Sequence, residues 1–275
     1  MKRNLPSNNK YDICDFLEYY TFIDGECDIE EYYYSSEDDD NYDSTQIDDI
    51  KGMLNRRLKL YYPYIPFRIH RNKIISMFQT EDLKNKNLHY LFCLYYSLYG
   101  GGKLSRKEST LFEIIVDAAL KSYLNTQHSI LTSFGENELT IREKIHELLN
   151  NTNELIGDLN LMPSHAKDGG IDIVTFKPLD DRGNQIIVLT DATLGKNWSE
   201  KKVLSKLKHW VQYIHFKTEP LTCLALARIV PTERFHYASC DNGLLFDRTR
   251  IVSFYVPKNE IEQELSIWRA EICVS

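Results

Sequence analysis

HAKDGGIDIVTFKPLDDRGNQIIVLTDATLGKNW, residues 165–198, is the stretch that decides the fold. It holds two apolar runs, GGIDIV at residues 169–174 and IIVLTDAT at residues 186–193, and each is typical of a β-strand. The intervening DDRGN, residues 180–184, is typical of a hairpin turn, in which Gly, Asp and Asn accept unusual backbone angles. The stretch therefore predicts two adjacent antiparallel strands.

Each of the two runs carries one acidic residue, Asp172 at the start of the first and Asp191 near the end of the second. An antiparallel pair brings these carboxylates close together, where they repel one another unless a cation lies between them. Asp168, just before the glycine pair, is a weaker candidate because it lies outside the apolar run. The alternative is a purely structural role, with both acids serving turns and caps.

This arrangement resembles the PD-(D/E)XK nuclease superfamily, which has the restriction-endonuclease-like fold. In that superfamily an Asp opens one strand, and an (Asp/Glu/Gln)-X-Lys tripeptide lies on the next. Asp172 matches the first acid, and Asp191-Ala192-Thr193 matches the tripeptide with Thr193 in place of Lys. An acid on a preceding helix is common there, and Glu113 fits that place. The resemblance covers roughly residues 105–256.

The resemblance implies hydrolysis of DNA phosphodiester bonds by a water molecule that Mg²⁺ or Mn²⁺ activates. Asp172, Asp191 and the backbone carbonyl of Ala192 would bind the ion, and Glu113 would bind it through water or orient the nucleophile. Thr193 can hydrogen-bond a water but carries no charge. A lysine from elsewhere would then supply the missing ammonium group.

Lys201 is the first choice for this lysine, because the start of the helix that follows should face the end of the second strand. Lys196, Lys202 and Lys167 are alternatives. The basic residues around this helix also predict a face that follows DNA phosphates and binds in a salt-sensitive way; they are Lys196, Lys202, Lys206 and Lys208. A solvated helix face explains the same pattern equally well.

Charge and composition divide the chain into three segments. Residues 1–50 contain 15 acidic and 3 basic residues, whereas residues 51–275 contain 25 acidic and 30 basic residues. We expect an acidic, partly disordered extension over residues 1–50, a helical, basic and aromatic subdomain over 51–104, and a nuclease core over 105–275. Within the extension, residues 35–49 (SSEDDDNYDSTQIDD) predict a disordered spacer or, alternatively, an autoinhibitory strip that mimics phosphate.

The order of the expected elements predicts an α/β fold with a mixed central β-sheet flanked by helices. The helices are expected at 87–99, 105–125 (with Ser109 as a cap), 140–151 (with a Thr140–Glu143 capping box), 199–213 and 260–272. Strands are expected at 129–134, in the two runs above, at 221–230 and at 251–256. Residues 51–79 are expected to form an extended pair of strands with exposed basic residues; the alternative is a basic and aromatic surface that binds nucleic acid.

Other features constrain the setting. No apolar run reaches the length of a membrane span, and the N-terminus lacks the apolar segment of a signal peptide, so a cytoplasmic location is expected. The six cysteines show no C-x-x-C pair, which argues for buried thiols and against zinc.

Two functions follow as expectations. The first is a nuclease of a bacterial restriction or anti-phage defence system, with a partner subunit that supplies specificity or activation and a homo-oligomer as a further option. The second is a catalytically weakened subunit that binds nucleic acid or a partner protein, motivated by the Thr193 replacement.

Overall fold

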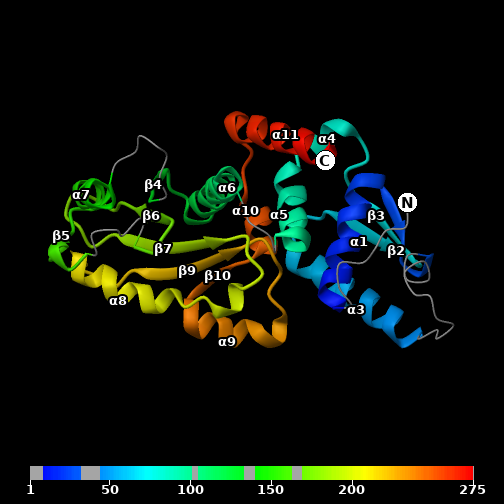
Figure 1. The fold of residues 1–275 in the computed structure, drawn as a ribbon, viewed down its shortest axis with the longest axis horizontal. Coiled ribbons are helices and arrows are strands. Elements are labelled where there is room, and N and C mark those ends of the chain that lie inside the picture. The colour runs from blue at the N-terminus through cyan, green and yellow to red at the C-terminus, as the bar shows by residue number, and fades with distance from the viewer. Residues whose placement is uncertain (1–8, 32–43, 101–104, 133–139, 163–168, 275) are drawn as a thin grey trace. The chain divides into compact units, whose positions relative to one another are not determined.

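The chain divides into two compact units in the computed structural model, which describes residues 9–31, 44–100, 105–132, 140–162 and 169–274 (Figure 1). Unit 1 comprises Met1–Lys103, Arg248–Ser253 and Pro257–Ser275, and unit 2 comprises Leu104–Asp247 and Phe254–Val256. This division differs from the three expected segments, because the C-terminal residues cluster with the N-terminal part of the chain. Within the described residues, no helix is both long enough and apolar enough to cross a membrane.

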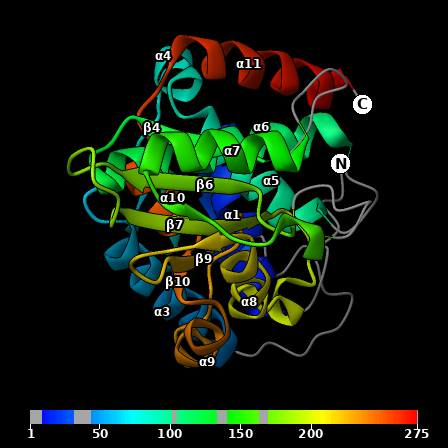
Figure 2. The ribbon, with the colours of Figure 1, turned by 90° about the vertical axis from the view of Figure 1, so that its left-hand side faces the viewer.

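Unit 2 is built around a five-stranded mixed sheet, so the expected α/β class with flanking helices is confirmed. The strand order is β10-β9-β7-β6-β4; β6 is antiparallel to both β4 and β7, and β9 is parallel to both β7 and β10 (Figure 2). The elements are α6 (Arg106–Leu124), β4 (His128–Leu131), α7 (Ile141–Thr152), β5 (Leu155–Ile156), β6 (Ile173–Lys177), β7 (Ile186–Thr193), α8 (Val203–Tyr213), β8 (Ile214–His215), β9 (Leu221–Leu226), α9 (Thr232–Asn242) and β10 (Leu244–Phe246).

Different helices cover the two faces of this sheet. Val174 of β6 and Leu189 of β7 share one hydrophobic cluster with apolar residues of α7 and α8, and α9 packs against the same cluster. The α6 helix packs against β6 and β7, yet none of its buried residues belongs to that cluster. Because alternate residues of a strand point to opposite faces, α6 must cover the other face. Figure 1 shows α6 on one side of β7 and β9, and α8 and α9 on the other.

Side-chain caps set the beginnings of two helices. Thr140 and Glu143 form the predicted capping box of α7. In α6 the cap is Ser105, whose side chain pairs with Glu108, so the prediction of Ser109 as a cap is wrong. Ser105 takes this role because the acidic residue three positions later completes a reciprocal box.

Unit 1 combines helices with a small antiparallel sheet in the order β1-β3-β2. Its elements are α1 (Lys10–Asp24), β1 (Glu26–Asp28), α3 (Ser44–Tyr61), β2 (Phe67–His70), β3 (Lys73–Ser76), α4 (Glu81–Asn85), α5 (Leu88–Tyr99), α10 (Arg248–Phe254, whose last residue clusters with unit 2) and α11 (Asn259–Val274).

Two segments adopt helix where the sequence predicted otherwise. Residues 44–61 form α3, although 44–49 were expected in a disordered spacer and 51–61 in a strand. Ile47, Ile50 and Leu54 are buried at helical spacing, which explains the difference. Of the strand expected over 251–256, residues 251–254 are instead the second half of α10, and residues 255–256 belong to no helix or strand. The rest of the acidic spacer, residues 35–43, lies outside the described residues.

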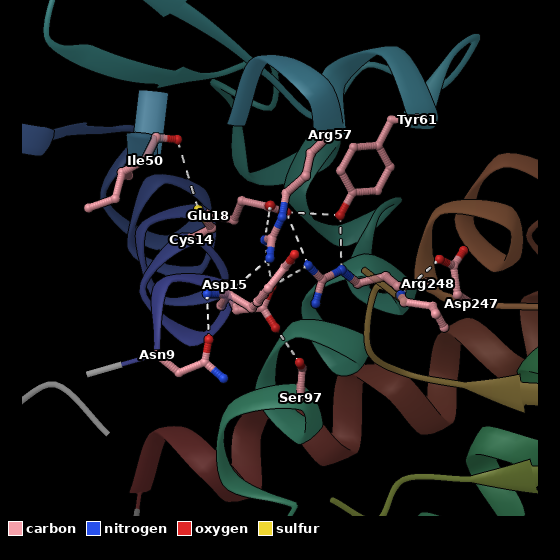
Figure 3. Close-up of polar contacts among 12 residues, drawn as sticks. Asn9, Cys14, Asp15, Glu18, Ile50, Arg57, Tyr61, Ser97, Asp247 and Arg248 are labelled. Atoms are coloured by element: carbon pink, nitrogen blue, oxygen red, sulfur yellow. Dashed lines mark hydrogen bonds and ion pairs between the residues drawn. The ribbon is translucent and has the colours of Figure 1, made fainter. Parts of the chain in front are cut away.

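Buried charged residues join α1, α3 and α10 within unit 1 (Figure 3). Arg57 Nη1 lies 2.6 Å from both Asp15 Oδ1 and Glu18 Oε1, and Arg248 Nη2 lies 2.6 Å from Asp15 Oδ1. The Tyr61 hydroxyl accepts from Arg248 Nε at 2.9 Å and donates to Glu18 Oε2 at 2.8 Å. Arg57 therefore does not belong to the basic surface expected over residues 51–79. We call Asp15, Glu18, Arg57, Tyr61 and Arg248 the buried ion cluster.

Charge pairing determines the protonation of this cluster. Burial by itself raises the pKa of Asp15, but the guanidinium groups of Arg248 and Arg57 outweigh burial and hold that pKa well below its ordinary value of 3.8. Asp15 is therefore ionised in the folded protein at every pH near neutrality.

Replacing Arg248 by Met should destabilise unit 1 by roughly 3–5 kcal/mol, because it leaves buried carboxylates without one of their two guanidinium partners. Urea unfolding measures the change. Arg269→Met is the control, since Arg269 pairs with the exposed Glu81 and its loss should cost less than about 1 kcal/mol. Equal effects of the two substitutions would contradict the stabilising role of the cluster.

Asp15 also predicts an acid dependence of stability. Its pKa is lower in the folded state, so its contribution is present above pH 3.8 and is lost as the pH falls toward the folded-state pKa. The difference in free energy of unfolding between wild type and Asp15→Asn should therefore shrink between pH 6 and pH 2.5. Asp82→Asn, which removes an exposed pair with Lys86, should show a small difference throughout. A gap for Asp15→Asn that does not change with pH would refute the assignment.

Candidate functional site

The pairing of β6 with β7 places Asp172 and Asp191 opposite one another. Ile173 pairs with Thr190, so the same register continued by one residue sets Asp172 across from Asp191. Residues directly opposite on antiparallel strands point to the same face, which here is the face that α7 and α8 cover. The predicted hairpin and the shared face of the two acids are therefore confirmed.

Asp172 is tied to β7 by its backbone and by its side chain. Its amide donates to the Thr190 carbonyl at 2.8 Å, and its Oδ2 accepts from the Ala192 amide at 2.8 Å. This second bond fixes the Asp172 carboxylate beside the residue that follows Asp191. The proposed use of the Ala192 carbonyl as a metal ligand stays a prediction.

Asp191 is buried, and two lysines compensate its charge. Lys201 Nζ lies 3.3 Å from Oδ1, and Lys206 Nζ forms a shorter ion pair with Oδ2. The side chain of Asp191 is 3% exposed, whereas those of Lys201 and Lys206 are 32% and 24% exposed. A buried carboxylate without such partners would carry a large desolvation cost, so the two ammonium groups stabilise it here.

The glycine pair before β6 makes room for these α8 side chains. Both glycines have positive φ, 61° at Gly169 and 76° at Gly170. A Cβ at Gly170 would lie 3.0 Å from Lys206 Cδ and Cε, and one at Gly169 would lie 3.1 Å from Trp210 Nε1. Lys206 Nζ also donates to the Gly170 carbonyl at 2.5 Å. The glycines therefore allow the Lys206 stem to cross the backbone and reach Asp191.

Local structure explains how Lys201 approaches the strand end. A 3-10 turn, Trp198–Glu200, follows β7, and α8 begins at Val203, whose amide donates to Asn242 Oδ1 at 2.9 Å. Lys201 lies between the turn and the helix. Its position beside Asp191 is the one that the sequence predicted, whereas its catalytic role stays untested.

The four lysines expected to form one DNA-binding face do not share one environment. Lys196, Lys202 and Lys208 are exposed, but Lys206 is half-buried on Asp191. Sequence reasoning therefore missed the place of Lys206. The sequence did contain one signal for this place. Lys206 and Trp210 are four residues apart on α8 and so share one face of the helix, and the glycine pair offers that face a surface without side chains.

Other predicted site residues lie apart from this pair or outside the described chain. Glu113 is buried in α6, which covers the opposite face of the sheet, so the structure does not bring it to the face of Asp172 and Asp191. Thr193 Oγ1 accepts from the Gly195 amide at 3.2 Å in a local turn. Asp168 and Lys167 lie outside the described residues.

The described residues contain no group of three His, Cys, Asp or Glu side chains placed to hold a metal ion. The metal site expected from the sequence has two acidic ligands, Asp172 and Asp191, with the Ala192 carbonyl, and it stays a prediction. Asp172 and Asp191 still offer the hard oxygen ligands that Mg²⁺ accepts, since this ion is commonly held by one or two carboxylates, with waters and phosphate oxygens completing its octahedron. Together the four side chains, two acids and two lysines, are formally neutral.

Comparison with family models, curated proteins and solved structures finds no match to this chain.

The glycine pair gives a prediction about stability. Gly170→Ala should lower the free energy of unfolding by about 1–2 kcal/mol or more, because an L-residue is strained at positive φ and its Cβ would press on the Lys206 stem. Urea unfolding measures it. Gly52→Ala is the matched control: this glycine lies inside α3 with nothing within 4 Å of an added Cβ, so the change should stabilise by about 0.5–1 kcal/mol. Gains of similar size at both positions would show that Gly170 is not constrained.

Proposed function

We propose that this protein is a metal-dependent nuclease that hydrolyses phosphodiester bonds of DNA, related to the PD-(D/E)XK superfamily. The observation that carries the proposal is the placement of Asp172 and Asp191 on one face of adjacent antiparallel strands, with Lys201 and Lys206 at Asp191. This set contains both acids of the resembled motif and an ammonium group from outside it. The order of α6, β4, the β6–β7 pair, α8 and parallel β9 agrees with the layered core that the resemblance implies.

Each residue of the set has a distinct part in the proposed reaction. A bound Mg²⁺ or Mn²⁺ would activate the attacking water and stabilise charge on the phosphate. Asp172 and Asp191 would hold that ion, and Ala192 would add its carbonyl. The ammonium group of Lys201, or of Lys206, would orient the water and offset the negative charge that develops on phosphate, replacing the motif lysine at Thr193.

The biological setting that we propose follows from the resemblance alone. The chain would act in a bacterial restriction or anti-phage defence system, with sequence specificity or activation supplied by a partner subunit.

A second candidate is a nuclease-fold subunit that binds nucleic acid or a partner protein without cutting. Both carboxylate oxygens of Asp191 are already paired with lysines, and Glu113 lies on the opposite face of the sheet. A purely structural ion-pair group would have the same properties, namely no net charge and a buried carboxylate whose two oxygens both have partners.

A plasmid-nicking assay with Mg²⁺ or Mn²⁺ separates the two candidates. Wild type should convert supercoiled plasmid to nicked or linear product, and Asp172→Asn and Asp191→Asn should each slow it by about a hundredfold or more, since a metal ligand contributes several kcal/mol to the transition state. Asp181→Asn is the control, because Asp181 is an exposed acid in the β6–β7 turn and has no part in the proposed site. Equal cleavage by all four proteins, or none by wild type, would reject the nuclease and favour the binding subunit.

A further inference from the structure

Lys201 and Lys206 retain hydrogen-bonding capacity beyond their contacts with Asp191. An ammonium group has three N–H donors. Among the described residues, Lys201 Nζ donates to one acceptor, Asp191 Oδ1, and Lys206 Nζ donates to two, Asp191 Oδ2 and the Gly170 carbonyl. Both side chains are a quarter to a third exposed, whereas Asp191 is almost fully buried. The two lysines therefore present more surface to a ligand from solvent than Asp191 does.

A carboxylate that bridges two ammonium groups has the chemistry of a bound phosphate. Its two oxygens share one negative charge and each accepts from a separate lysine, as two oxygens of a phosphodiester do. Lysine presents a compact point charge, which suits phosphate oxygens without demanding a fixed orientation.

We propose that Asp191 occupies, in the free protein, the place that a nucleic-acid phosphate takes on Lys201 and Lys206, so that Asp191 is an internal competitor for the phosphodiester backbone. The competition weakens nucleic-acid binding as long as Asp191 is charged and the two lysines are the only cations that pair with it. It ends when the charge of Asp191 is removed or otherwise compensated, and both lysines then become phosphate ligands.

Charge explains why the contact suppresses binding. The group formed by Asp172, Asp191, Lys201 and Lys206 has no formal net charge, so it offers a polyanion little attraction. Removing the charge of Asp191 leaves it at +1, beside the exposed Lys202. Each phosphate contact made there would release counterions and steepen the salt dependence of binding.

The choice of nucleic acid as ligand rests on the proposed function, but the competition itself needs neither cleavage nor metal. Binding is therefore measured in EDTA, by fluorescence anisotropy of a labelled DNA duplex over a series of salt concentrations. The proteins are wild type, Asp191→Asn, Asp181→Asn and the triple variant Asp191→Asn, Lys201→Gln, Lys206→Gln. Asp181 is an exposed acid in the β6–β7 turn, so its replacement removes the same charge elsewhere in unit 2.

Asp191→Asn should bind about tenfold more tightly than wild type, and its plot of log K against log salt should steepen by about 0.9 for each added phosphate contact. Asp181→Asn should bind like wild type, and the triple variant should lose the gain. Thermal unfolding checks that each protein is folded. If Asp191→Asn does not fold, Asp191→Thr takes its place, since a β-branched residue suits a strand.

Asp191→Asn binding no tighter than wild type would overturn the proposal, and so would an equal gain in Asp181→Asn or in the triple variant. The two proposals can fail independently of one another. Tighter binding by Asp191→Asn together with no cleavage by wild type would reject the nuclease function and support the competition by Asp191. Cleavage by wild type without tighter binding by Asp191→Asn would support the nuclease function and reject the competition.

Discussion

The antiparallel register of β6 and β7 is the constraint on which the candidate site depends. Ile173 opposite Thr190 sets every following pair, including Asp172 opposite Asp191. A slip of one residue would turn the acids away from α8 and expose the apolar set of one strand. That slip is opposed from both sides of β7, because β9 pairs with it in parallel from Val188 to Thr193. The acids are thus placed by strands whose central residues are fully buried.

The local features of unit 2 could be predicted from its sequence, because each depends on neighbours in the chain. The hairpin, the capping box at Thr140 and the position of Lys201 are of this kind. The place of Lys206 could not be read in the same way, since it depends on a stem that crosses Gly170, 36 residues earlier. The side of the sheet on which Glu113 lies depends on how α6 packs, which a helical stripe alone does not specify.

In unit 1, contacts between residues far apart in the chain limited the prediction even more. Residues 1–50 carry 15 acidic residues, and their composition predicted an acidic, partly disordered extension. Asp15 and Glu18 are instead buried against Arg57 and Arg248, so part of that charge is neutralised in the interior. The partner Arg248 is 233 residues from Asp15 in the chain. No window of sequence contains both, so the burial of these acids could not be predicted from composition. The helical spacing of Ile47, Ile50 and Leu54, by contrast, was a local signal for α3 that the prediction missed.

The path of the chain through the two units has a consequence for biosynthesis. Unit 2 is nearly contiguous, from Leu104 to Asp247, whereas unit 1 draws on Arg248–Ser253 and on α11. Translation therefore completes the central sheet while Asp15 and Glu18 still lack one of their two guanidinium partners. Since domains fold as their residues emerge, unit 1 is completed after unit 2, because Asp15 and Glu18 gain their second guanidinium partner only when Arg248 has left the ribosome.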